Sequence, residues 1–377
     1  MKIALIHHLR RGGAHRRIVE QLRCLPSDLT VEEFIIEGAE PVTENPHVIA
    51  FAPRGDAAPA WKKPVERYRD HFRLERAWVE LSRVVEATNC DAVWANPCHE
   101  LKVPPLTEGL ARRTVFYLDE PDRQYFDPSM KNSTRRITRP VYFVLNYKRR
   151  TAQQRNALKM AEVVTNSAFT ARMINSAYKR SSKVIPLGVH QRFSPGSHEI
   201  VRSGALSVGT LIPSKGHDLA IAAVAKQVPV IPLTVIAPRR EESELQRLQT
   251  LARDLGVEVA FHFGVSDEAL VDAYQSAAVT LYLAKAEPFG LVSVEAQACG
   301  STMVLVDEGG LPETAAGNPL VIVVEREVDA IAAVMATALR PVNAAQRQVC
   351  AEGVQQRWSW DVSSQLLAKA LKEVASR

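Results

Sequence analysis

The chain has 377 residues, of which 46% are hydrophobic and 24% are charged, and its formal net charge at pH 7 is +5. This composition is ordinary for a soluble globular protein, and a chain of this length is expected to form two domains. It excludes a membrane span, because no apolar run approaches roughly 20 residues, and five scattered cysteines without CxxC spacing indicate a reducing, cytoplasmic compartment and no metal framework.

The first half of the chain alternates short β-rich runs with helical patterns. The expected strands are KIALIHH, VEEFIIE, HVIAF, DAVWAN, TVFYLD and VVTNS, and the expected helices cover 15–24, 64–88, 140–162 and 168–178. Strands that alternate with helices of ten or more residues indicate right-handed βαβ units and a parallel sheet. The N-terminal apolar run lacks a small-residue cleavage site after it, so we read it as the first strand and not as a signal peptide.

The second half repeats this pattern. Its expected strands are ALSVGT, LTVIAP, VEVAFHFG, VTLYLA and TMVLVD, and its expected helices are HDLAIAAVAKQ, ESELQRLQTLARDLG, DEALVDAYQSA and a segment after Phe289. The Gly-, Pro- and Ser-rich stretch 186–204 predicts a hinge. We therefore expect an α/β protein with two doubly wound, Rossmann-like domains, 1–188 and 189–360, and a C-terminal helix over 361–377 that could cross back to the first domain.

Ligands of such sheets bind at the carboxyl ends of the strands, so two facing domains would enclose a cleft. Gly12 and Gly13 follow the first strand, where backbone amides and a helix N-terminus can face an anion. A turn that simply needs glycine is the alternative. In SVGTLIPSKG a strand ends at Gly209, and Lys215 can reach a phosphate from the loop as a point charge. A solvated surface lysine is the alternative there.

The stretch EPFGLVSVEAQACG, 287–300, places two carboxylates in apolar surroundings. Pro288 and Gly290 favour a turn, and a helix beginning near Leu291 would direct its first amides at the cleft. Glu295 follows four residues later, and a carboxylate accepts hydrogen bonds from sugar hydroxyls well. A helix-start carboxylate stabilised by the helix dipole is the alternative. DEGGLPET, 307–314, adds a second glycine turn after a strand.

Together these pieces resemble glycosyltransferase family 4, the retaining nucleotide-sugar enzymes of GT-B fold, in which two facing Rossmann-like domains enclose a cleft. The family's two glutamates, separated by seven residues, match Glu287 and Glu295. GTLIPSKG resembles its donor-phosphate loop, VVTNSAFTARMI and VIPLGVHQRF resemble its interdomain segments, and RWSWD is similar to its C-terminal signature. The resemblance covers most of the chain and is strongest from residue 160 onward.

The resemblance implies a donor site on the second domain. Glu295 would bind the donor ribose, Glu287 would contact the hexose, and Lys215 would neutralise the diphosphate leaving group. The remaining donor-binding positions would act largely through their backbone, at Gly12, Gly13, Gly209, Thr210, Gly264, Val265, Phe289, Gly290 and Leu291. We expect Glu287, Lys215 and Asp119 to act in catalysis.

Two positions depart from the family pattern. Thr210 stands where an arginine often follows the glycine of the phosphate loop, and Arg10, Arg11 and Arg16 are candidate substitutes. YLDEPDRQYF resembles a mannosyltransferase segment reading Tyr-Cys-His-x-Pro-x-Arg, with Asp119 in the place of the histidine. Asp119 or Glu120 would fill that role, and Arg123 remains on the acceptor side. A structural aspartate at a strand end is the alternative.

The resemblance implies a retaining transferase that moves a hexose from a nucleoside diphosphate sugar, GDP-mannose or a UDP-sugar, to a glycan or lipid-linked hydroxyl. An inactive nucleotide-sugar-binding subunit, an epimerase and a phosphorylase are alternatives. The sequence has no Asp-x-Asp pair and no HExxH spacing, so we expect neither a metal nor another cofactor. Residues 101–200 hold 18 basic and 7 acidic side chains, which can attract a phosphorylated or lipid-linked substrate or an anionic membrane surface. Nothing resembles a nucleic-acid motif, so we expect no nucleic-acid partner. A solvated basic surface is the alternative.

Overall fold

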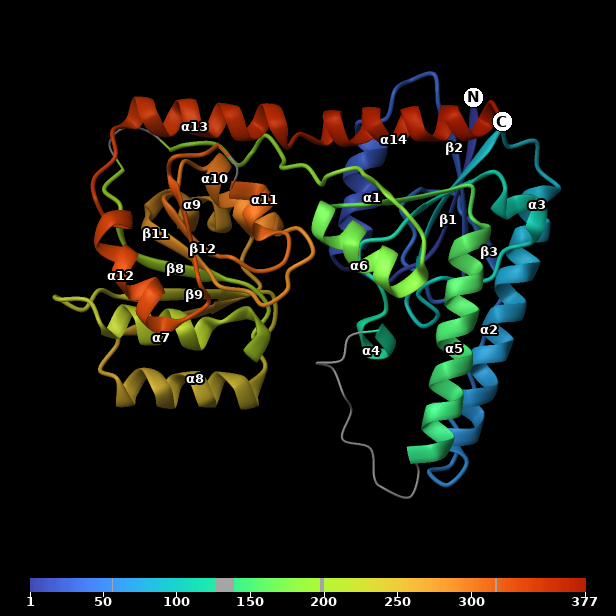
Figure 1. The fold of residues 1–377 in the computed structure, drawn as a ribbon, viewed down its shortest axis with the longest axis horizontal. Helices are drawn as coiled ribbons and strands as arrows, with labels where there is room; N and C mark the ends of the chain where they lie inside the picture. The colour runs from blue at the N-terminus through green and yellow to red at the C-terminus, as the bar shows by residue number, and fades with distance from the viewer. Residues whose placement is uncertain (56, 127–138, 197–199, 316) are drawn as a thin grey trace. The chain divides into compact units, whose positions relative to one another are not determined.

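The computed structural model describes residues 1–377 except 56, 127–138, 197–199 and 316. The chain divides into two compact units, Met1–Pro186 with Ser363–Arg377, and Leu187–Val362. Each unit is built around its own parallel sheet, as the alternation of strands and helices predicts (Figure 1).

The first unit contains a parallel sheet with the strand order β3-β2-β1-β4-β5-β6-β7. Its central strands are buried along nearly their whole length because helices cover the sheet, which explains their continuous apolar runs. The strands are β1 (Lys2–His8), β2 (Thr30–Ile36), β3 (His47–Ile49), β4 (Ala92–Cys98), β5 (Thr114–Tyr117), β6 (Glu162–Thr165) and β7 (Lys183–Val184).

Helices follow the strands of this sheet. The longest, α2, has proline within its first turn, where the missing N–H costs no helical hydrogen bond. The Ser167 hydroxyl caps α6 by accepting from the amide of Thr170. The helices are α1 (Gly13–Arg23), α2 (Lys63–Glu86), α3 (Glu108–Ala111), α4 (Arg123–Phe126), α5 (Arg139–Lys159) and α6 (Ala168–Tyr178).

The second unit has the strand order β10-β9-β8-β11-β12-β13, again with parallel neighbours. In Figure 1, α7 and α8 cover one face of this sheet and α9, α10 and α11 cover the other. The strands are β8 (Ser203–Val208), β9 (Leu233–Ala237), β10 (Val259–Phe263), β11 (Ala277–Tyr282), β12 (Met303–Val306) and β13 (Val321–Val324).

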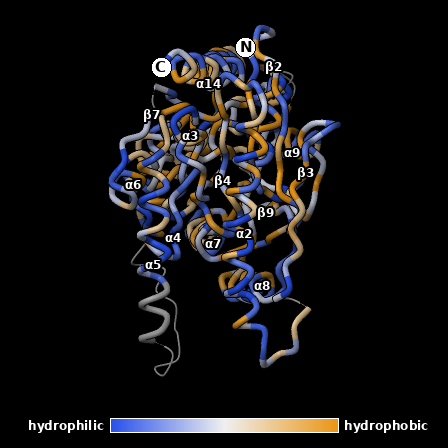
Figure 2. The backbone as a smooth tube through the Cα atoms, turned by 90° about the vertical axis from the view of Figure 1, so that its right-hand side faces the viewer, coloured by the Kyte–Doolittle hydropathy of each residue, from blue (hydrophilic) through white to orange (hydrophobic). Residues whose placement is uncertain are grey.

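A short 3-10 helix, η2 (Pro213–Lys215), precedes the first long helix of this unit. Figure 2 shows hydrophobic and hydrophilic residues alternating along helices such as α8 and α14, as expected for helices that bury one face. The α-helices are α7 (His217–Ala225), α8 (Glu242–Asp254), α9 (Asp267–Ser276), α10 (Leu291–Ala298), α11 (Leu311–Ala315), α12 (Val328–Ala338) and α13 (Ala344–Arg357).

The expected elements differ from the observed ones in a few places. The helix expected over 140–162 ends at Lys159, because Glu162 already begins β6. The strand β13 and the helices α12 and α13 were not among the expected elements. No described helix combines the length and the apolarity that a membrane crossing requires.

The last helix, α14 (Trp360–Ala375), begins in the second unit and continues into the first. From Ser363 onward it packs with the first unit, and the Ser363 hydroxyl donates to the carbonyl of Pro186. Just before it, the Val189 amide donates to the carbonyl of Trp358 at 2.6 Å. The two chain segments near the boundary, VIPLGVHQRF and RWSWD, therefore lie side by side.

Candidate functional site

The strand order of the second sheet reverses direction between β8 and β11. At such a switch point the loops leaving the two strands diverge to opposite faces and open a crevice for a ligand. The loop after β8 carries Gly209, Thr210 and Lys215, and the loop after β11 carries Glu287 and the Phe-Gly turn. Two segments that are far apart in the sequence and were expected to serve one site thus leave neighbouring strands.

An ion pair joins these two loops. The Lys215 Nζ lies 2.7 Å from Glu287 Oε2, and each side chain is 19% exposed. The Lys215 backbone is fixed by η2, whose end at Gly216 adopts a left-handed conformation. A Cβ on Gly216 would meet the carbonyl of Leu283, so glycine lets the phosphate-type loop pack directly on the loop after β11.

Tyr282 ends β11 beneath this pair, with the Lys215 ammonium 5.9 Å from its ring centre. Burial raises the pKa of Tyr282, and the negative charge of Glu287 raises it further, so the phenol stays neutral. The two loops therefore place the cation of Lys215 and the anion of Glu287 next to the neutral ring of Tyr282.

The expected second glycine turn supports the backbone of Glu287. The amide of Gly310 donates to the Glu287 carbonyl at 2.7 Å, and a Cβ on Gly309 would clash with the same oxygen. The Glu308 carboxylate accepts from the amide of Ala286. The amide of Gly310 is thus used internally to hold the turn.

Helix α10 starts at Leu291, where the sequence predicted a helix to begin, and Gly290 caps it with φ of 103°. Glu295 lies in its second turn, is 5% exposed, and its Oε2 accepts from the Tyr274 hydroxyl at 3.4 Å. Burial, followed by the charge of Glu295, raises the pKa of Tyr274, which keeps the phenol a donor. The second glutamate is therefore a buried carboxylate with a fixed hydroxyl partner.

The Phe289 ring is buried and packs edge to face on Trp358, with ring centres 5.4 Å apart. This contact connects EPFG with RWSWD, two motifs that the sequence could not place in contact. Gly264 and Val265 follow β10, and the amide of Gly264 donates to the carbonyl of Ala237 at 3.0 Å. They lie beyond the ends of β9 and β10, further along the same edge of the sheet.

In the first sheet the strand order reverses between β1 and β4. Gly12 and Gly13 follow β1 and are exposed at the start of α1. Gly12 has an extended backbone, and a Cβ on Gly13 would meet no atom within 4 Å. The chain's own packing thus does not require either glycine, whereas a ligand close to the backbone would.

Asp119 follows β5 and forms a two-pronged ion pair with Arg17 of α1. The Arg17 Nε lies 2.9 Å from Oδ1 and its Nη2 lies 3.0 Å from Oδ2. Arg17 is fully buried, donates also to Gln21 and Asn96, and stacks 3.7 Å over the ring of Tyr117. Asp119 keeps 19% of its side chain exposed, so it is anchored internally and still accessible.

Neighbouring charges complete this edge of the first unit. Glu120 is paired with Lys102 at 3.3 Å and with Arg123 at 3.1 Å. Of the candidate substitutes for the missing phosphate-loop arginine, Arg11 is paired with Glu40 at 2.6 Å. Helix α1 begins at the glycine loop and carries Arg17, so it connects this loop with Asp119. Glu120 and Arg123 lie beside Asp119.

His7, near the end of the first strand, forms a buried pair with Glu33 that was not predicted from the sequence. The Leu9 amide donates to His7 Nδ1, which places the ring proton on Nε2, and this atom lies 2.8 Å from Glu33 Oε1. Burial lowers the pKa of His7, although the Glu33 carboxylate opposes this effect. Hydrogen bonds from His7 and Thr43 lower the pKa of Glu33 despite its burial. A neutral imidazole therefore donates to an ionised carboxylate below the glycine loop.

Arg17 was also missed, because α1 reads as a surface helix rich in arginine. Its position in the helix could have indicated that it is buried. Of the arginines in 10–17, only Arg17 lies on the helix face that carries the buried Ile18 and Gln21. Within the described ranges no group of three or more His, Cys, Asp or Glu side chains is arranged to hold a metal ion.

Comparison with known proteins shows which family the second unit resembles. The model of the family described as Glycosyl transferases group 1 matches residues 202–355. D-inositol 3-phosphate glycosyltransferase of Acidothermus cellulolyticus is 35% identical over 173 residues, 40% of this chain and 39% of that protein. A GDP-mannose-dependent alpha-(1-6)-phosphatidylinositol monomannoside mannosyltransferase of Mycolicibacterium smegmatis is 31% identical over 199 residues, 48% of this chain and 50% of that protein.

The chain thus spans about half or less of these two relatives. Solved structures match over nearly all of the chain. Anabaena HepE in complex with UDP has a TM-score of 0.71 at 17% identity, and the match covers 99% of this chain and 100% of that one. Sucrose-phosphate synthase from Thermosynechococcus elongatus has a TM-score of 0.68 at 17% identity, covering 100% and 99%. The expected GT-B fold of two Rossmann-like units is confirmed, and residues 202–355 are similar to the group 1 glycosyl transferases.

Proposed function

We propose that this protein transfers a hexose from a nucleoside diphosphate sugar to a hydroxyl of a glycan or lipid-linked acceptor, with retention at the anomeric carbon. The observation that carries the proposal is the Lys215–Glu287 pair, which joins the two loops at the switch point of the second sheet. Switch points bind ligands through strand-end loops, and a lysine ammonium has three donors, so it can contact Glu287 and a diphosphate together.

In this proposal the donor lies along the carboxyl edge of the second sheet. Lys215 neutralises the charge that develops on the leaving diphosphate, while the amides at Phe289, Gly290 and Leu291 bind oxygens of the sugar and the diphosphate. Glu287 accepts from hexose hydroxyls, and Glu295 accepts from hydroxyls of the ribose. Electrostatic stabilisation of this kind commonly lowers the activation barrier more than any other single effect in an enzyme.

The remaining donor contacts would come from the backbone. Gly264 and Val265 would contact the base beyond the ends of β9 and β10, and Gly209 and Thr210 would line the phosphate loop. In the first unit, the open space beside Gly13 would admit a phosphate oxygen close to the amides of Gly12 and Gly13.

Asp119 would accept a hydrogen bond from a sugar hydroxyl as an anion. Both of its oxygens already accept from Arg17, which fixes the carboxylate orientation. This role differs from proton transfer, which requires a group whose protonation changes during the reaction. Glu120 and Arg123 would border the acceptor beside it, and the leaving group would depart without a divalent ion.

The choice of donor follows from two observations. YLDEPDRQYF retains the proline and the arginine of the mannosyltransferase segment, and a similar relative is named as GDP-mannose-dependent. A structural neighbour was solved with UDP-glucose. We therefore propose GDP-mannose as the first donor to test and a UDP-sugar as its competitor.

The test is a binding screen followed by turnover. Thermal shift and calorimetry with GDP, UDP and ADP, and with their sugars, should identify one base, and the matching sugar nucleotide should then be consumed with an acceptor. Lys215→Met should weaken diphosphate binding tenfold or more and leave nucleoside binding unchanged, because only the phosphates need the charge. Lys226→Met, at an exposed lysine paired with Asp329, is the matched control.

Two outcomes separate the alternatives. Absence of a shift with every nucleotide would remove the donor site altogether. Tight nucleotide binding without consumption of any donor, in the presence of excess acceptor candidates, would favour an inactive binding subunit. Turnover that persists in excess chelator would support a metal-independent reaction.

We propose further that the protein associates with anionic membranes through the start of α2. Trp61, in the turn before α2, and Val65 and Phe72, within α2, are 75%, 53% and 44% exposed, with Lys62 and Arg67 beside them. Apolar side chains flanked by cations are typical of helices that lie at an anionic interface. Co-sedimentation with phosphatidylglycerol vesicles should fall for Trp61→Ser with Phe72→Ser, and unchanged sedimentation would contradict this surface.

A further inference from the structure

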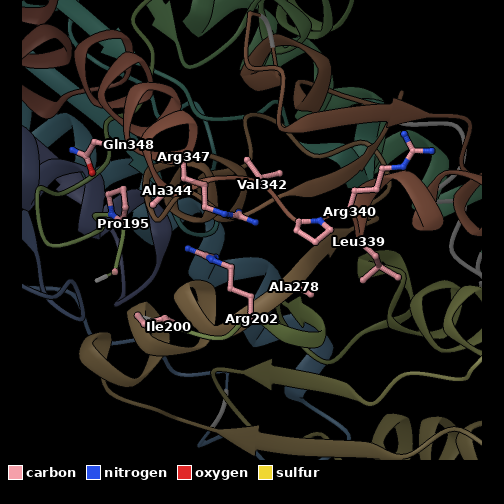
Figure 3. Close-up of a pocket in the computed structure, with 12 residues that line it drawn as sticks. Pro195, Ile200, Arg202, Ala278, Leu339, Arg340, Val342, Ala344, Arg347 and Gln348 are labelled. Carbon is pink, nitrogen blue, oxygen red and sulfur yellow. The ribbon is translucent and has the colours of Figure 1, made fainter. Parts of the chain in front are cut away.

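A second pocket lies at the opposite end of the second sheet from the donor loops (Figure 3). Its volume is about 250 Å³. It is bounded by the residue before β8, the start of β11, the end of α12 and the start of α13. The basic residues in its lining are Arg202, Arg340 and Arg347, and the remaining lining residues used below are Ala278 and Ala344.

Two of the arginines reach toward each other from opposite walls, as Figure 3 shows. Arg202 donates to the carbonyls of Tyr274 and Cys299, both at 3.0 Å, and Arg347 donates to the carbonyl of Gly300. These carbonyls lie at or near the C-terminal ends of α9 and α10. Both guanidinium groups are therefore fixed in position by the backbone before any ligand arrives.

The charges in this pocket do not balance. Among the described residues, which leave out 197–199, Arg202, Arg340 and Arg347 have no carboxylate partner. Two helix C-termini carry roughly −0.5 each, about −1 together, against the +2 of the paired guanidinium groups. Burial, together with the charge of Arg347, lowers the pKa of Arg202 to about 10. The described residues that line the pocket, which leave out 197–199, thus retain an excess positive charge.

We propose that this pocket is a binding site for a phosphate dianion, either inorganic phosphate or the terminal group of a small phosphomonoester. A guanidinium offers five N–H donors in a planar fork that suits phosphate oxygens. Arg202 and Arg347 use some of these donors on carbonyls and direct the others into the cavity. A phosphate between them would supply at least the negative charge that the pair lacks, and the cavity volume suits a small ligand.

The phosphate site is separate from the donor site. Arg202 and Ala278 lie at the amino ends of β8 and β11, whereas Lys215 and Glu287 follow the carboxyl ends of the same strands. Helix α10 begins at the donor turn and ends beside the pocket, a span of about 12 Å for eight residues. A ligand in the pocket would therefore hold the far end of the helix whose first turn faces the donor.

The test introduces a carboxylate into the pocket by mutation, as a substitute for the negative charge of the ligand. Ala344 is the first residue of α13 and lies one turn before Arg347, so Ala344→Glu would place a carboxylate in the pocket at a position that the helix dipole favours. Ala344→Gln is the matched neutral control. Potassium phosphate is titrated against potassium chloride at equal ionic strength, with the melting temperature and calorimetric affinity as readouts. Lys215→Met in parallel removes the cation of the donor site.

Phosphate should raise the melting temperature of the wild type, of Ala344→Gln and of Lys215→Met, and its affinity should fall at least tenfold in Ala344→Glu. Ala344→Glu should itself melt above Ala344→Gln without phosphate, which shows that the variant is folded. Tighter binding of glycerol 3-phosphate than of inorganic phosphate would identify an ester as the ligand, and the reverse would identify the free ion. No response beyond that to chloride, or a response lost in Lys215→Met and kept in Ala344→Glu, overturns the proposal.

Discussion

A fully buried arginine needs a partner, and the way Arg17 obtains one determines how Asp119 can act. The guanidinium is satisfied on all sides by Asp119, Asn96, Gln21 and the face of Tyr117. Desolvation makes such a pair weak evidence for stability, but removal of one partner leaves a buried charge and is strongly destabilising. Asp119 therefore has a structural role whatever its role in the reaction.

This predicts an asymmetric double-mutant cycle. Asp119→Asn alone should lower the free energy of unfolding by about 3 kcal/mol, because Arg17 stays charged without its counter-ion. Arg17→Gln with Asp119→Asn should recover most of that loss, because no buried charge remains. Chemical denaturation measures the change in stability, and kcat with saturating donor measures the change in catalysis.

If Asp119 contacts the sugar, turnover should stay low in the double variant although its stability has recovered. Recovery of turnover together with stability would show that Asp119 acts only by supporting Arg17. Arg17→Gln alone should leave a partly exposed carboxylate, which water can solvate, so its stability should fall less than that of Asp119→Asn.

The sequence allowed the residues of the second unit to be proposed more completely than those of the first. Lys215 and Glu287 could be proposed because each lies in a short motif after a strand, and the topology then brings those strands together. Arg17 could not, because its pairing with Asp119 spans 102 residues and depends on the packing of α1 over β5. Glu33 was hidden in the same way, since a charged residue inside a strand shows its buried partner only in three dimensions.

At the level of elements, the glycine turn after β12 is a support for the loop that carries Glu287. Gly309 has φ of +68°, and a Cβ there would lie 2.6 Å from the Glu287 nitrogen and still closer to its carbonyl oxygen. Both atoms are backbone, so the contact cannot be relieved by a side-chain rotation. The loop must move if the glycine is replaced.

Gly309→Ala should therefore lower the free energy of unfolding and weaken donor binding together. Gly256→Ala is the matched control, because Gly256 has nearly the same φ, +67°, and no atom within 4 Å of an added Cβ. The control should cost about 1 kcal/mol from backbone strain alone. Gly309→Ala should cost at least about twice as much, measured by denaturation, and equal losses in the two variants would show that the contact is unimportant.

Buried histidines at strand and helix ends make stability depend on pH. Burial lowers the pKa values of His7 and His217, and it lowers the pKa of His8 to about 4. Below about pH 6.5 the unfolded chain takes up protons that the folded protein does not, so the free energy of unfolding falls as the pH falls. The loss continues until the pH reaches the folded-state pKa values.

Urea denaturation at pH 7.5 and pH 5 should show this loss, with about 2 kcal/mol from His8 alone. His8→Gln removes one titrating group and should flatten the profile. A wild-type profile that is level over this range would contradict the neutral buried imidazoles.

The elements themselves were predictable to different degrees. Strong apolar runs such as β1 and β12 are buried on both faces and were identified. The elements β13 and α13 were not predicted. The strand β13 is only partly buried, and the helix α13 has few buried residues. Periodicity identifies an element through its buried face, so lightly covered elements at a sheet edge escape it.

On the scale of the whole molecule, the chain leaves the first unit near Pro186 and returns at Ser363. Close to this boundary the Val189 amide is bonded to the Trp358 carbonyl, and a Cβ on Gly188 would clash with the Trp360 nitrogen. Trp358 also packs on Phe289 of the donor turn. The crossing segments are therefore in contact with each other and with the proposed donor site.

The returning helix completes the first unit. In α14, Leu367, Ala368, Leu371 and Val374 are buried, and the Ser364 hydroxyl donates to the carbonyl of Gln21 in α1. Burying a leucine or valine side chain contributes about 1.5–3 kcal/mol, so the loss of this helix should exceed the margin by which a unit of this size is stable. The C-terminal segment is thus a structural part of a unit that begins more than 300 residues earlier.

Truncation after Val362 should unfold or loosen the first unit while the second keeps its structure. Hydrogen exchange resolved by peptide should show loss of protection in β1 and α1 and retained protection in β8 and β11. Removal of Ser376 and Arg377 alone is the control and should change protection little, because the buried positions of α14 remain. Equal loss of protection in both units would mean that they unfold as one cooperative body, and unchanged protection would show that the first unit is stable without its last helix.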